Sequence, residues 1–187
     1  IPCFELIREG RALHRGHSLR PPKYSQYAAD DVHEAVGLPY ELHNADSYNE
    51  TCAQVGVFMW SWRMLLITGQ ARFGDLMERE MYNGWLPAVS LDGGSWFYTN
   101  PLRWYGDKQV MQGQDSQGRF LPGTSHICCP TNVTRTIAEL RGYLFSAMGD
   151  DLYVHHYAGS VYDGAKWGLN METQYPWDGT IALTMDS

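Results

Sequence analysis

Two neighbouring stretches of the chain carry apolar residues at helical spacing. The first runs from Val55 to Thr68 and is followed by Gly69, a residue type that commonly ends helices. The second runs from Ala71 to Trp85, with Asn83-Gly84 as its predicted stop. Because the connection between them is so short, the two helices are expected to be antiparallel. Such a helical hairpin is the repeating unit of helical barrels and solenoids.

A third helix is predicted directly after a pair of adjacent cysteines. Pro130 suits the first helical position, and the apolar pattern continues from Thr131 to Ser146. Its predicted core-facing stripe consists of Val133, Ile137, Leu140 and Leu144. This helix would place the thiols of Cys128 and Cys129 at its N-terminus, where unbonded N–H groups and the helix dipole favour the thiolate form.

Near Gly149 the pattern changes to the alternation that is typical of strands. Three later segments alternate and are separated by Asp-containing turns: Leu152–Tyr157, Trp167–Thr173 and Thr180–Met185. Further upstream, Trp96–Thr99 is a short extended piece, and residues 106–124 are a polar, Gly- and Gln-rich surface excursion. The chain is therefore predicted to be mainly α, with a helical region that passes into a β region.

Composition and charge exclude several classes of function. The chain has 187 residues, 44% of them hydrophobic, which suffices for one domain with a core. Its net charge of -7 argues against nucleic acid or an anionic membrane as a partner. No run approaches the length of a transmembrane helix, and the first residues lack a signal-peptide pattern. Four cysteines are too few for a disulfide scaffold, so reduced thiols favour a cytoplasmic setting, although a metal can protect thiols elsewhere.

Two short motifs carry the candidate chemistry, namely Glu50-Thr51-Cys52 and Cys128-Cys129-Pro130. Adjacent cysteines pair poorly with each other in a disulfide, and a soft metal is the usual agent that holds both. Three thiolates and a carboxylate would complete a tetrahedral shell around one zinc ion. The alternative is that these cysteines are small buried hydrophobic residues.

Glu50 also has a competing structural interpretation. Ser47-Tyr48-Asn49-Glu50 has the form of a capping box, in which the Glu50 side chain would bind the Ser47 backbone N–H instead of a metal. Residues 50 and 52 also lie about 200° apart on a regular helix. Both would reach one metal only if the first turn were irregular, so the spacing leaves the two interpretations open.

Further motifs follow one another along the chain: Glu34-Ala35-Val36-Gly37, Tyr40-Glu41-Leu42, Tyr48–Ala53, Leu91-Asp92-Gly93, Phe97–Leu102, Cys128-Cys129-Pro130 and Glu172–Gly179. In this order they resemble the bacterial β-L-arabinofuranosidases of glycoside hydrolase family 127 and the related family 146. The resemblance covers roughly Val32 to the end of the chain. Residues 1–31 are poorly matched, and His43 stands where the family commonly has proline.

The resemblance implies an (α/α)6 barrel followed by a β-sandwich. Residues 1–149 would be the C-terminal part of the catalytic barrel, and residues 150–187 the first strands of the sandwich. Members of the family are several times longer, so the chain is expected to be a piece of the enzyme, inactive alone, with the remainder of the parent chain as its partner. The oligomeric state stays open, a homodimer being one option.

The resemblance also assigns roles to individual residues. The ligands of one zinc ion would be Glu50, Cys52, Cys128 and Cys129. Cys128 matches the nucleophile and Glu34 the general acid/base of a retaining hydrolase that acts on arabinose-containing glycans. Tyr98 is expected to hydrogen-bond the sugar, the alternative being a buried aromatic residue near a strand end.

Two other classes of function remain alternatives. One is a structural zinc protein whose four ligands only join helices. The other is a carbohydrate-binding module, which the seven Trp and twelve Tyr residues would suit, although core packing explains most of them. Glu34 favours the enzyme because it lies in a matching motif ahead of Glu50. Reaction of Cys128 with a thiol-alkylating sugar would separate the enzyme from both alternatives.

Overall fold

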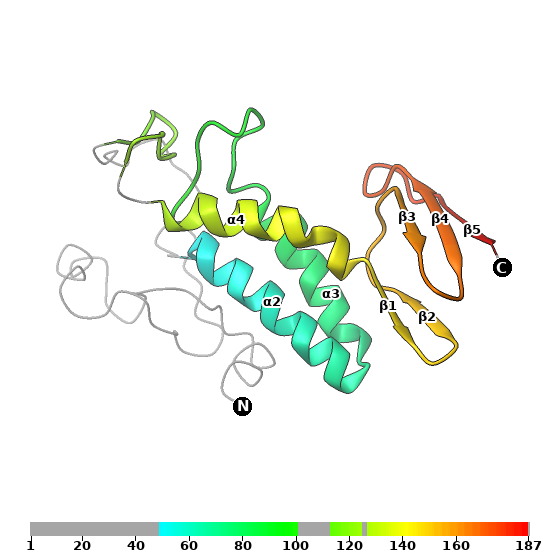
Figure 1. Ribbon diagram of the computed structural model, residues 1–187. Helices are drawn as coiled ribbons and strands as arrows, with labels where there is room; N and C mark the ends of the chain where they lie inside the picture. Colours follow the sequence, from blue (N-terminus) through cyan, green and yellow to red (C-terminus); the bar gives the residue numbers. More distant parts are fainter. Residues whose placement is uncertain (1–48, 101–112, 125–126, 187) are drawn as a thin grey trace. The chain divides into compact units, whose positions relative to one another are not determined.

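The computed structural model describes residues 49–100, 113–124 and 127–186 (Figure 1). The chain divides into two compact units, Ile1–Arg135 and Thr136–Ser187, and each is described by itself. The motif that contains Glu34 lies outside the described residues. Within the described ranges, every helix is too short or too polar to cross a membrane.

The predicted helical hairpin is present in the first unit. It consists of α2 (Thr51–Thr68) and α3 (Ala71–Glu80), which lie side by side (Figure 1). Gly69 ends α2 as predicted: its φ of 65° is left-handed, and its N–H donates to the Leu65 carbonyl at 2.8 Å. The hairpin and the segment after it bury an apolar core: Val55, Phe58, Trp62, Leu65, Phe73, Met77 and Trp85.

The second helical segment ends at Trp85 as predicted, but its last part is not α-helical. After Glu80 the chain continues as a π-helical segment, η2 (Met81–Trp85), and Asn83-Gly84 lies inside this last turn rather than after it. Gly84 packs closely against α2, because a Cβ at this position would force the end of the Gln54 side chain to shift. The wider turn directs Trp85 into the core, where its ring packs edge-on against Phe58 at 5.6 Å.

The third helix, α4 (Cys128–Glu139), begins at the cysteines and ends earlier than predicted. A 3₁₀ segment, η3 (Leu140–Tyr143), follows it, and Ser146 already belongs to a strand. The predicted apolar stripe is wrong at Ile137, which is 50% exposed. Ile137 lies within the regular part of α4, so the change to three residues per turn at Leu140 affects only the later members of the stripe, Leu140 and Leu144.

The second unit contains two small antiparallel sheets. In the first sheet, β1 (Phe145–Met148) pairs with β2 (Asp151–Val154). In the second, the strand order is β3 (Ser160–Asp163), β4 (Gly168–Thr173), β5 (Ile181–Asp186). The three predicted strands correspond to β2, β4 and β5, with shifted ends. The other two strands were not predicted, because β1 follows directly on a helical pattern and β3 is only four residues long.

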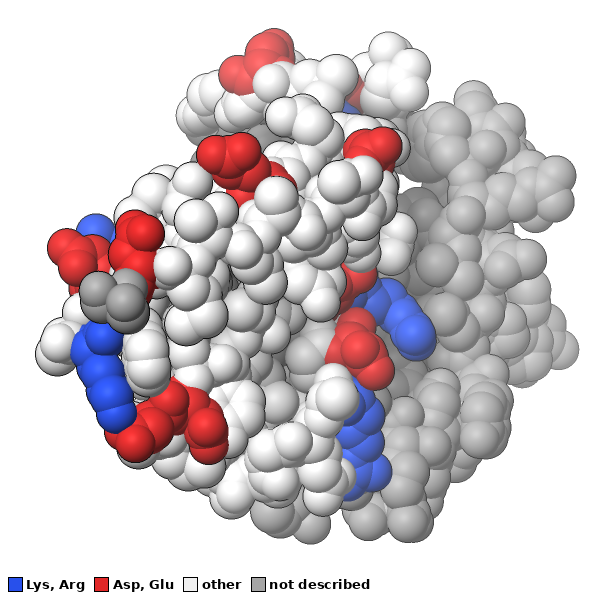
Figure 2. Space-filling model, turned by 90° about the vertical axis from the view of Figure 1, so that its right-hand side faces the viewer, with Lys and Arg blue, Asp and Glu red and all other residues white. Residues whose placement is uncertain are grey.

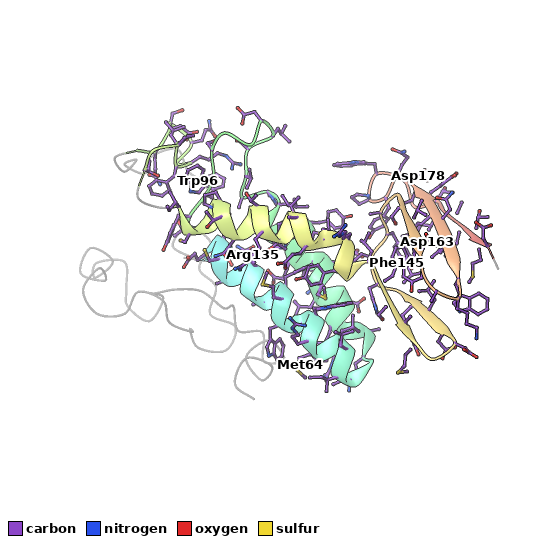
Figure 3. The ribbon with its side chains drawn as sticks, in the orientation of Figure 1. Met64, Trp96, Arg135, Phe145, Asp163 and Asp178 are labelled. Atoms are coloured by element: carbon purple, nitrogen blue, oxygen red, sulfur yellow. The ribbon has the colours of Figure 1, made fainter. Side chains whose placement is uncertain are left out.

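The loop after the hairpin is organised around Trp96, which Figure 3 labels. Trp96 forms isolated bridges with Val89 and with Phe120. The Trp96 N–H donates to the Phe120 carbonyl at 3.0 Å, and the Phe120 N–H donates to the Trp96 carbonyl at 2.7 Å. Both side chains are buried, so Phe120 contradicts the prediction that residues 106–124 are merely a surface excursion.

Candidate metal centre and active site

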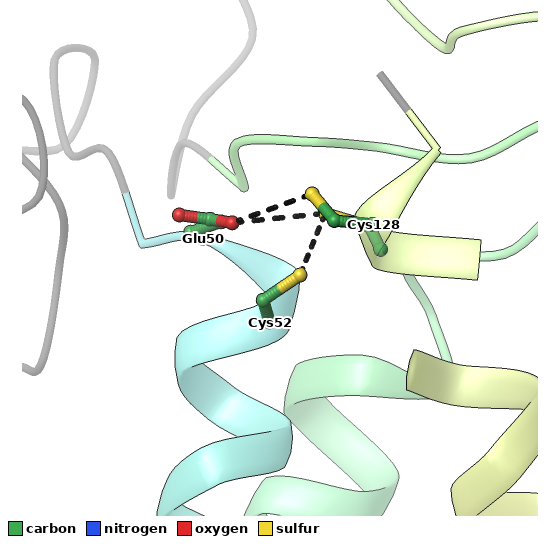
Figure 4. A group of neighbouring side chains, drawn as sticks. Glu50, Cys52 and Cys128 are labelled. Carbon is green, nitrogen blue, oxygen red and sulfur yellow. Dashed lines mark hydrogen bonds between the residues drawn. The ribbon is translucent and has the colours of Figure 1, made fainter. Parts of the chain in front are cut away.

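Two helix N-termini meet at the predicted motifs. Glu50 is the N-cap residue of α2 and Cys52 follows in its first turn, whereas Cys128 and Cys129 open α4. Figure 4 shows the Glu50, Cys52 and Cys128 side chains gathered between these two helix starts. One donor atom from each of the four residues lies within 4.8 Å of all the others. The structure therefore brings the four predicted ligand residues together.

The capping-box interpretation of Glu50 is wrong. Because α2 begins at Thr51, Glu50 is the N-cap residue and not the third residue of the helix, and its side chain makes no capping hydrogen bond. Its backbone is extended, with φ -63° and ψ 138°, so it lies outside the regular helix. The angular separation that a regular helix imposes between Glu50 and Cys52 therefore does not apply.

An unusual backbone conformation at Asn49 precedes Glu50. The φ of Asn49 is 39°, in the left-handed region that residues other than glycine seldom adopt. The Asn49 carbonyl accepts hydrogen bonds from Asn100 Nδ2 at 3.0 Å and from Gln54 Nε2 at 2.9 Å. Asn100 Nδ2 also lies 2.9 Å from Thr51 Oγ1. These contacts hold the chain where it enters α2 and so fix the position from which the Glu50 side chain extends.

The distances between the donor atoms fit a tetrahedral shell. Cys129 Sγ lies 3.4 Å from Cys52 Sγ and 3.9 Å from Cys128 Sγ. Glu50 Oε1 lies 4.0 Å from Cys128 Sγ and 4.0 Å from Cys129 Sγ. Zinc–sulfur bonds of about 2.3 Å in tetrahedral geometry would place sulfur atoms about 3.8 Å apart. The group can therefore hold a metal ion, and three sulfur donors with one oxygen donor are a set that suits zinc.

The surroundings of the cluster are largely apolar. Trp96, Phe120 and Cys129 form one buried group, against which Cys52, Val89 and Tyr98 pack. The Glu50 carboxylate is itself completely buried. A buried carboxylate is stable when a cation or hydrogen-bond donors compensate its charge. The low polarity around the cluster thus strengthens its attraction for a cation.

The three thiols differ in exposure and in acidity. Cys128 is exposed and Cys129 is buried. Hydrogen bonds, chiefly from Cys129 and against the effect of burial, lower the pKa of Cys52 to about 5. Burial raises the pKa of Cys128, although a hydrogen bond with Tyr98 opposes the rise. The hydrogen bond with Cys52, followed by burial, raises the pKa of Cys129. Without a cation, the first thiolate of the cluster is therefore Cys52.

Tyr98 lies beside the cluster. The Thr51 N–H donates to the Tyr98 carbonyl at 3.1 Å, which ties the loop to the start of α2. The Tyr98 ring packs edge-on against Phe120 with centroids 6.3 Å apart, and its side chain reaches Cys128. Glu34, the predicted acid/base, lies outside the described residues.

One further polar residue of α4, Asn132, contacts the cluster, and a second, Arg135, contacts Asn132; both were missed in the sequence. Asn132 Nδ2 donates to Cys52 Sγ at 3.2 Å, and Arg135 Nη2 donates to Asn132 Oδ1 at 2.7 Å. A signal was present, because Cys129, Asn132 and Arg135 follow one another at intervals of three residues, which places them along one helix face. The role of this face becomes apparent only in the structure, where Cys52 of α2 contacts Asn132.

The fold and the site together define a helical segment of a domain that can hold a metal ion between two helix starts. Residues 24–142 match the family model for the GH127 catalytic domain of β-L-arabinofuranosidases, and the chain belongs to this glycoside hydrolase family. The resemblance inferred from the motifs is thereby confirmed. The helices and two small sheets also match solved structures of the family.

Individual relatives agree with this assignment. The non-reducing end β-L-arabinofuranosidase of Bifidobacterium longum subsp. longum is 30% identical over 164 residues, which are 82% of this chain and 24% of that protein. A solved GH127 β-arabinofuranosidase is 39% identical with a TM-score of 0.70, over 82% of this chain and 23% of its own. The GH127 β-L-arabinofuranosidase from Geobacillus stearothermophilus T6 is 34% identical with a TM-score of 0.68, over 82% of this chain and 25% of its own. The chain thus spans about a quarter of the length of these relatives.

Proposed function

We propose that the chain is part of a zinc-dependent retaining glycoside hydrolase that releases L-arabinofuranose from β-L-arabinofuranosides. In this proposal, residues 1–149 belong to an (α/α)6 catalytic barrel and residues 150–187 begin a β-sandwich. The observation that carries the proposal is the difference between the two adjacent cysteines of the ligand cluster: Cys129 is buried, whereas Cys128 is at least partly exposed. A site that only joined helices would gain nothing from an exposed sulfur atom, whereas a nucleophile must be reachable.

The ligands of the zinc ion would be Glu50, Cys52, Cys128 and Cys129. When bound, zinc would supply the positive charge that keeps thiols deprotonated near neutral pH. The chain contributes in the same direction, because α2 and α4 both direct their positive N-terminal ends toward the cluster. The thiolate of Cys128 is then available without a separate base.

The first chemical step is a displacement at the anomeric carbon of the sugar. Cys128 Sγ forms a bond to this carbon while the bond to the leaving oxygen breaks, and Glu34 donates its proton to that oxygen. The product is a sugar held by a carbon–sulfur bond. Tyr98, which reaches Cys128, is expected to hydrogen-bond the sugar and orient it for this attack.

The second step releases the sugar. Water attacks the same carbon, Glu34 now accepts the water proton, and the carbon–sulfur bond breaks to restore the Cys128 thiolate. Two successive inversions retain the configuration, as in retaining enzymes that use a carboxylate nucleophile. The apolar group around Trp96 and Phe120 includes Cys129 and packs against Cys52, so it shields these two sulfur atoms from bulk water and leaves Cys128 reachable.

Substitutions in the longer enzyme test these roles. Cys128→Ser is expected to abolish turnover of an aryl β-L-arabinofuranoside, because serine supplies no thiolate. Glu34→Gln is expected to lower the rate about 10²–10⁴-fold, the usual effect of losing a general acid. Cys129→Ser is expected chiefly to lower zinc content, measured by elemental analysis. Near-native turnover by Cys128→Ser would show that the nucleophile is another residue.

A labelling experiment separates the enzyme from a non-catalytic zinc-stapled structural or carbohydrate-binding fragment. An L-arabinofuranosyl haloacetamide is expected to alkylate Cys128, and peptide mass spectrometry locates the modified residue. Cys129, which is buried, serves as the internal control. Either alternative predicts no sugar-dependent labelling of Cys128, and the absence of metal from freshly reduced protein would refute the zinc site itself.

A further inference from the structure

We propose that Asn132 and Arg135 form a hydrogen-bond relay that draws negative charge away from Cys52 and thereby strengthens the metal site. The proposal rests on the proposed zinc-dependent function and adds two positioning residues that are not metal ligands. They act through Cys52, and neither is assigned contact with substrate.

The orientation of the Asn132 side chain is fixed by its two neighbours. Its Nδ2 donates to Cys52 Sγ at 3.2 Å, and its Oδ1 accepts from Arg135 Nη2 at 2.7 Å. Rotation of the amide by 180° would place the carbonyl oxygen against an acceptor sulfur and the NH₂ group against a guanidinium. Since a guanidinium never accepts a hydrogen bond, the reversed amide would lose both contacts.

The charge of the ligand set explains what the relay does. Three thiolates and one carboxylate carry four negative charges, so the shell around a divalent cation has a formal charge of about -2. Buried negative charge needs hydrogen-bond donors. The bond from the Arg135 guanidinium polarises the Asn132 amide and makes its N–H a stronger donor toward sulfur. The relay therefore offsets part of the excess negative charge of the ligand shell, at the sulfur atom of Cys52.

The relay also joins two helices. Cys52 belongs to α2, whereas Asn132 and Arg135 belong to α4. Figure 3 labels Arg135 on α4. Since Cys128 and Cys129 open the same α4 helix, a bond from α4 to Cys52 holds the ligands of both helices in register. Hydrogen-bond partners of metal ligands typically contribute 10–100-fold to metal affinity.

The test uses zinc affinity and the spectrum of the cobalt-substituted protein. Zinc dissociation constants are measured by competition with a chromophoric chelator for the unsubstituted protein and for Asn132→Ala, Arg135→Gln and Arg135→Lys. Asn132→Ala is expected to weaken zinc binding about 10–100-fold. Arg135→Gln is expected to weaken it less, and Arg135→Lys to restore part of the loss, because lysine keeps the charge.

The sulfur-to-cobalt charge-transfer band supplies a readout that a general loss of stability would not move. Its energy depends on the charge at sulfur, so it is expected to shift in Asn132→Ala and, by less, in Arg135→Gln. Thr134→Ala is the matched control: Thr134 is an exposed neighbour on α4 whose hydroxyl donates to the Pro130 carbonyl at 2.8 Å. This variant is expected to leave the zinc affinity and the energy of the charge-transfer band unchanged.

The outcomes distinguish this proposal from the proposed function. Failure of the unsubstituted protein to bind zinc would overturn the function, and the relay with it. Zinc binding by the unsubstituted protein, together with unchanged affinity and band in Asn132→Ala, would overturn the relay alone. If Asn132→Ala does not fold, Arg135→Gln decides, because it leaves the amide in place and removes only its polarisation. An unchanged affinity and band in Arg135→Gln would then refute the relay.

Discussion

Glu80, on the last turn of α3, has a carboxyl group whose pKa is strongly shifted by burial. Burial raises its pKa to about 7, although the neighbouring Arg79 guanidinium opposes the rise. Its Oε2 atom lies toward Gly84, at the π-helical segment that packs against Gln54. Unlike the thiols of the cluster, Glu80 has no role in the proposed chemistry. Its titration therefore reports on folding rather than on catalysis.

The pKa of Glu80 predicts that stability falls as the pH rises. The folded state binds the proton up to about pH 7, whereas the unfolded chain releases it near 4.5. Its contribution to the free energy of unfolding is thus complete below pH 4.5 and is lost as the pH rises through about 7. Glu80→Gln is expected to stabilise the fold at pH 8, by up to about 3 kcal/mol, with little change at pH 4.5. Urea unfolding at the two pH values measures this.

Arg79→Gln is the companion variant for this prediction. It removes the cation that lowers the pKa of Glu80, so the loss of stability should move to higher pH. Equal effects of Glu80→Gln at both pH values would contradict a protonated Glu80 in the folded state.

At the scale of whole elements, the sequence predicts where helices exist better than where they end. The end of α2 could be predicted because it depends on one neighbouring residue, the glycine at position 69. The end of α4 could not, because the change through η3 into β1 depends on pairing with β2, which a local pattern does not contain. The same limit applies to strand β3.

The candidate site, like the helices, could be predicted only in part from the sequence. Its ligand residues could be predicted from two motifs and from the family resemblance. The decision between capping and metal binding at Glu50 could not, because it depends on where α2 begins. That start is set by contacts from far along the chain, among them the bridge between Glu50 and Thr99 and the hydrogen bonds of Asn100. The lowered pKa of Cys52 likewise depends on residues of another helix, chiefly Cys129 and to a smaller extent Asn132.

Gly84 gives a prediction at the scale of the helical hairpin. Gly→Ala within a helix usually stabilises by about 0.5–1 kcal/mol. At Gly84 the new methyl group would displace the Gln54 amide, which donates to the Asn49 carbonyl at 2.9 Å just before Glu50. We therefore expect Gly84→Ala to destabilise the fold by about 1–3 kcal/mol, as overpacking does, and also to weaken zinc binding. Thermal melts and chelator competition measure the two effects.

Gly74→Ala is the matched control in the same hairpin. A Cβ at Gly74 would meet its nearest atom, Leu65 Cδ2, at 3.9 Å, which is ordinary contact. This variant is expected to be neutral or slightly stabilising. If both variants behaved alike, close packing of Gly84 against Gln54 would not be the reason for glycine there.

At the scale of the whole molecule, much apolar surface is exposed in each unit. In the first unit Ile67 is 77% exposed, and in the second Val161 is 75% and Trp177 is 91% exposed. On the described part of the face in Figure 2, charged side chains form only small scattered groups, and no extended basic area is visible. Since the relatives are about four times longer, we expect other parts of a longer enzyme to cover these apolar residues.

The 187-residue chain by itself is therefore expected to lack turnover. Helical hairpins of a barrel bury their apolar faces on their neighbours, and part of the sugar pocket would come from elements outside this chain. Hydrolysis of an aryl β-L-arabinofuranoside by the purified chain is compared with that by a full-length relative. Comparable rates would show that the chain is a complete catalytic unit.

Cys52 and Cys129, separated by 77 residues in sequence, hold their sulfur atoms 3.4 Å apart. A disulfide requires about 2.05 Å, so a small shift of either helix start would allow oxidation to join them. Cys52 is the acidic thiol, and oxidants attack thiolates. A metal bound to both sulfur atoms would block this reaction. Removal of the metal by a chelator is thus expected to speed formation of the Cys52–Cys129 disulfide in air.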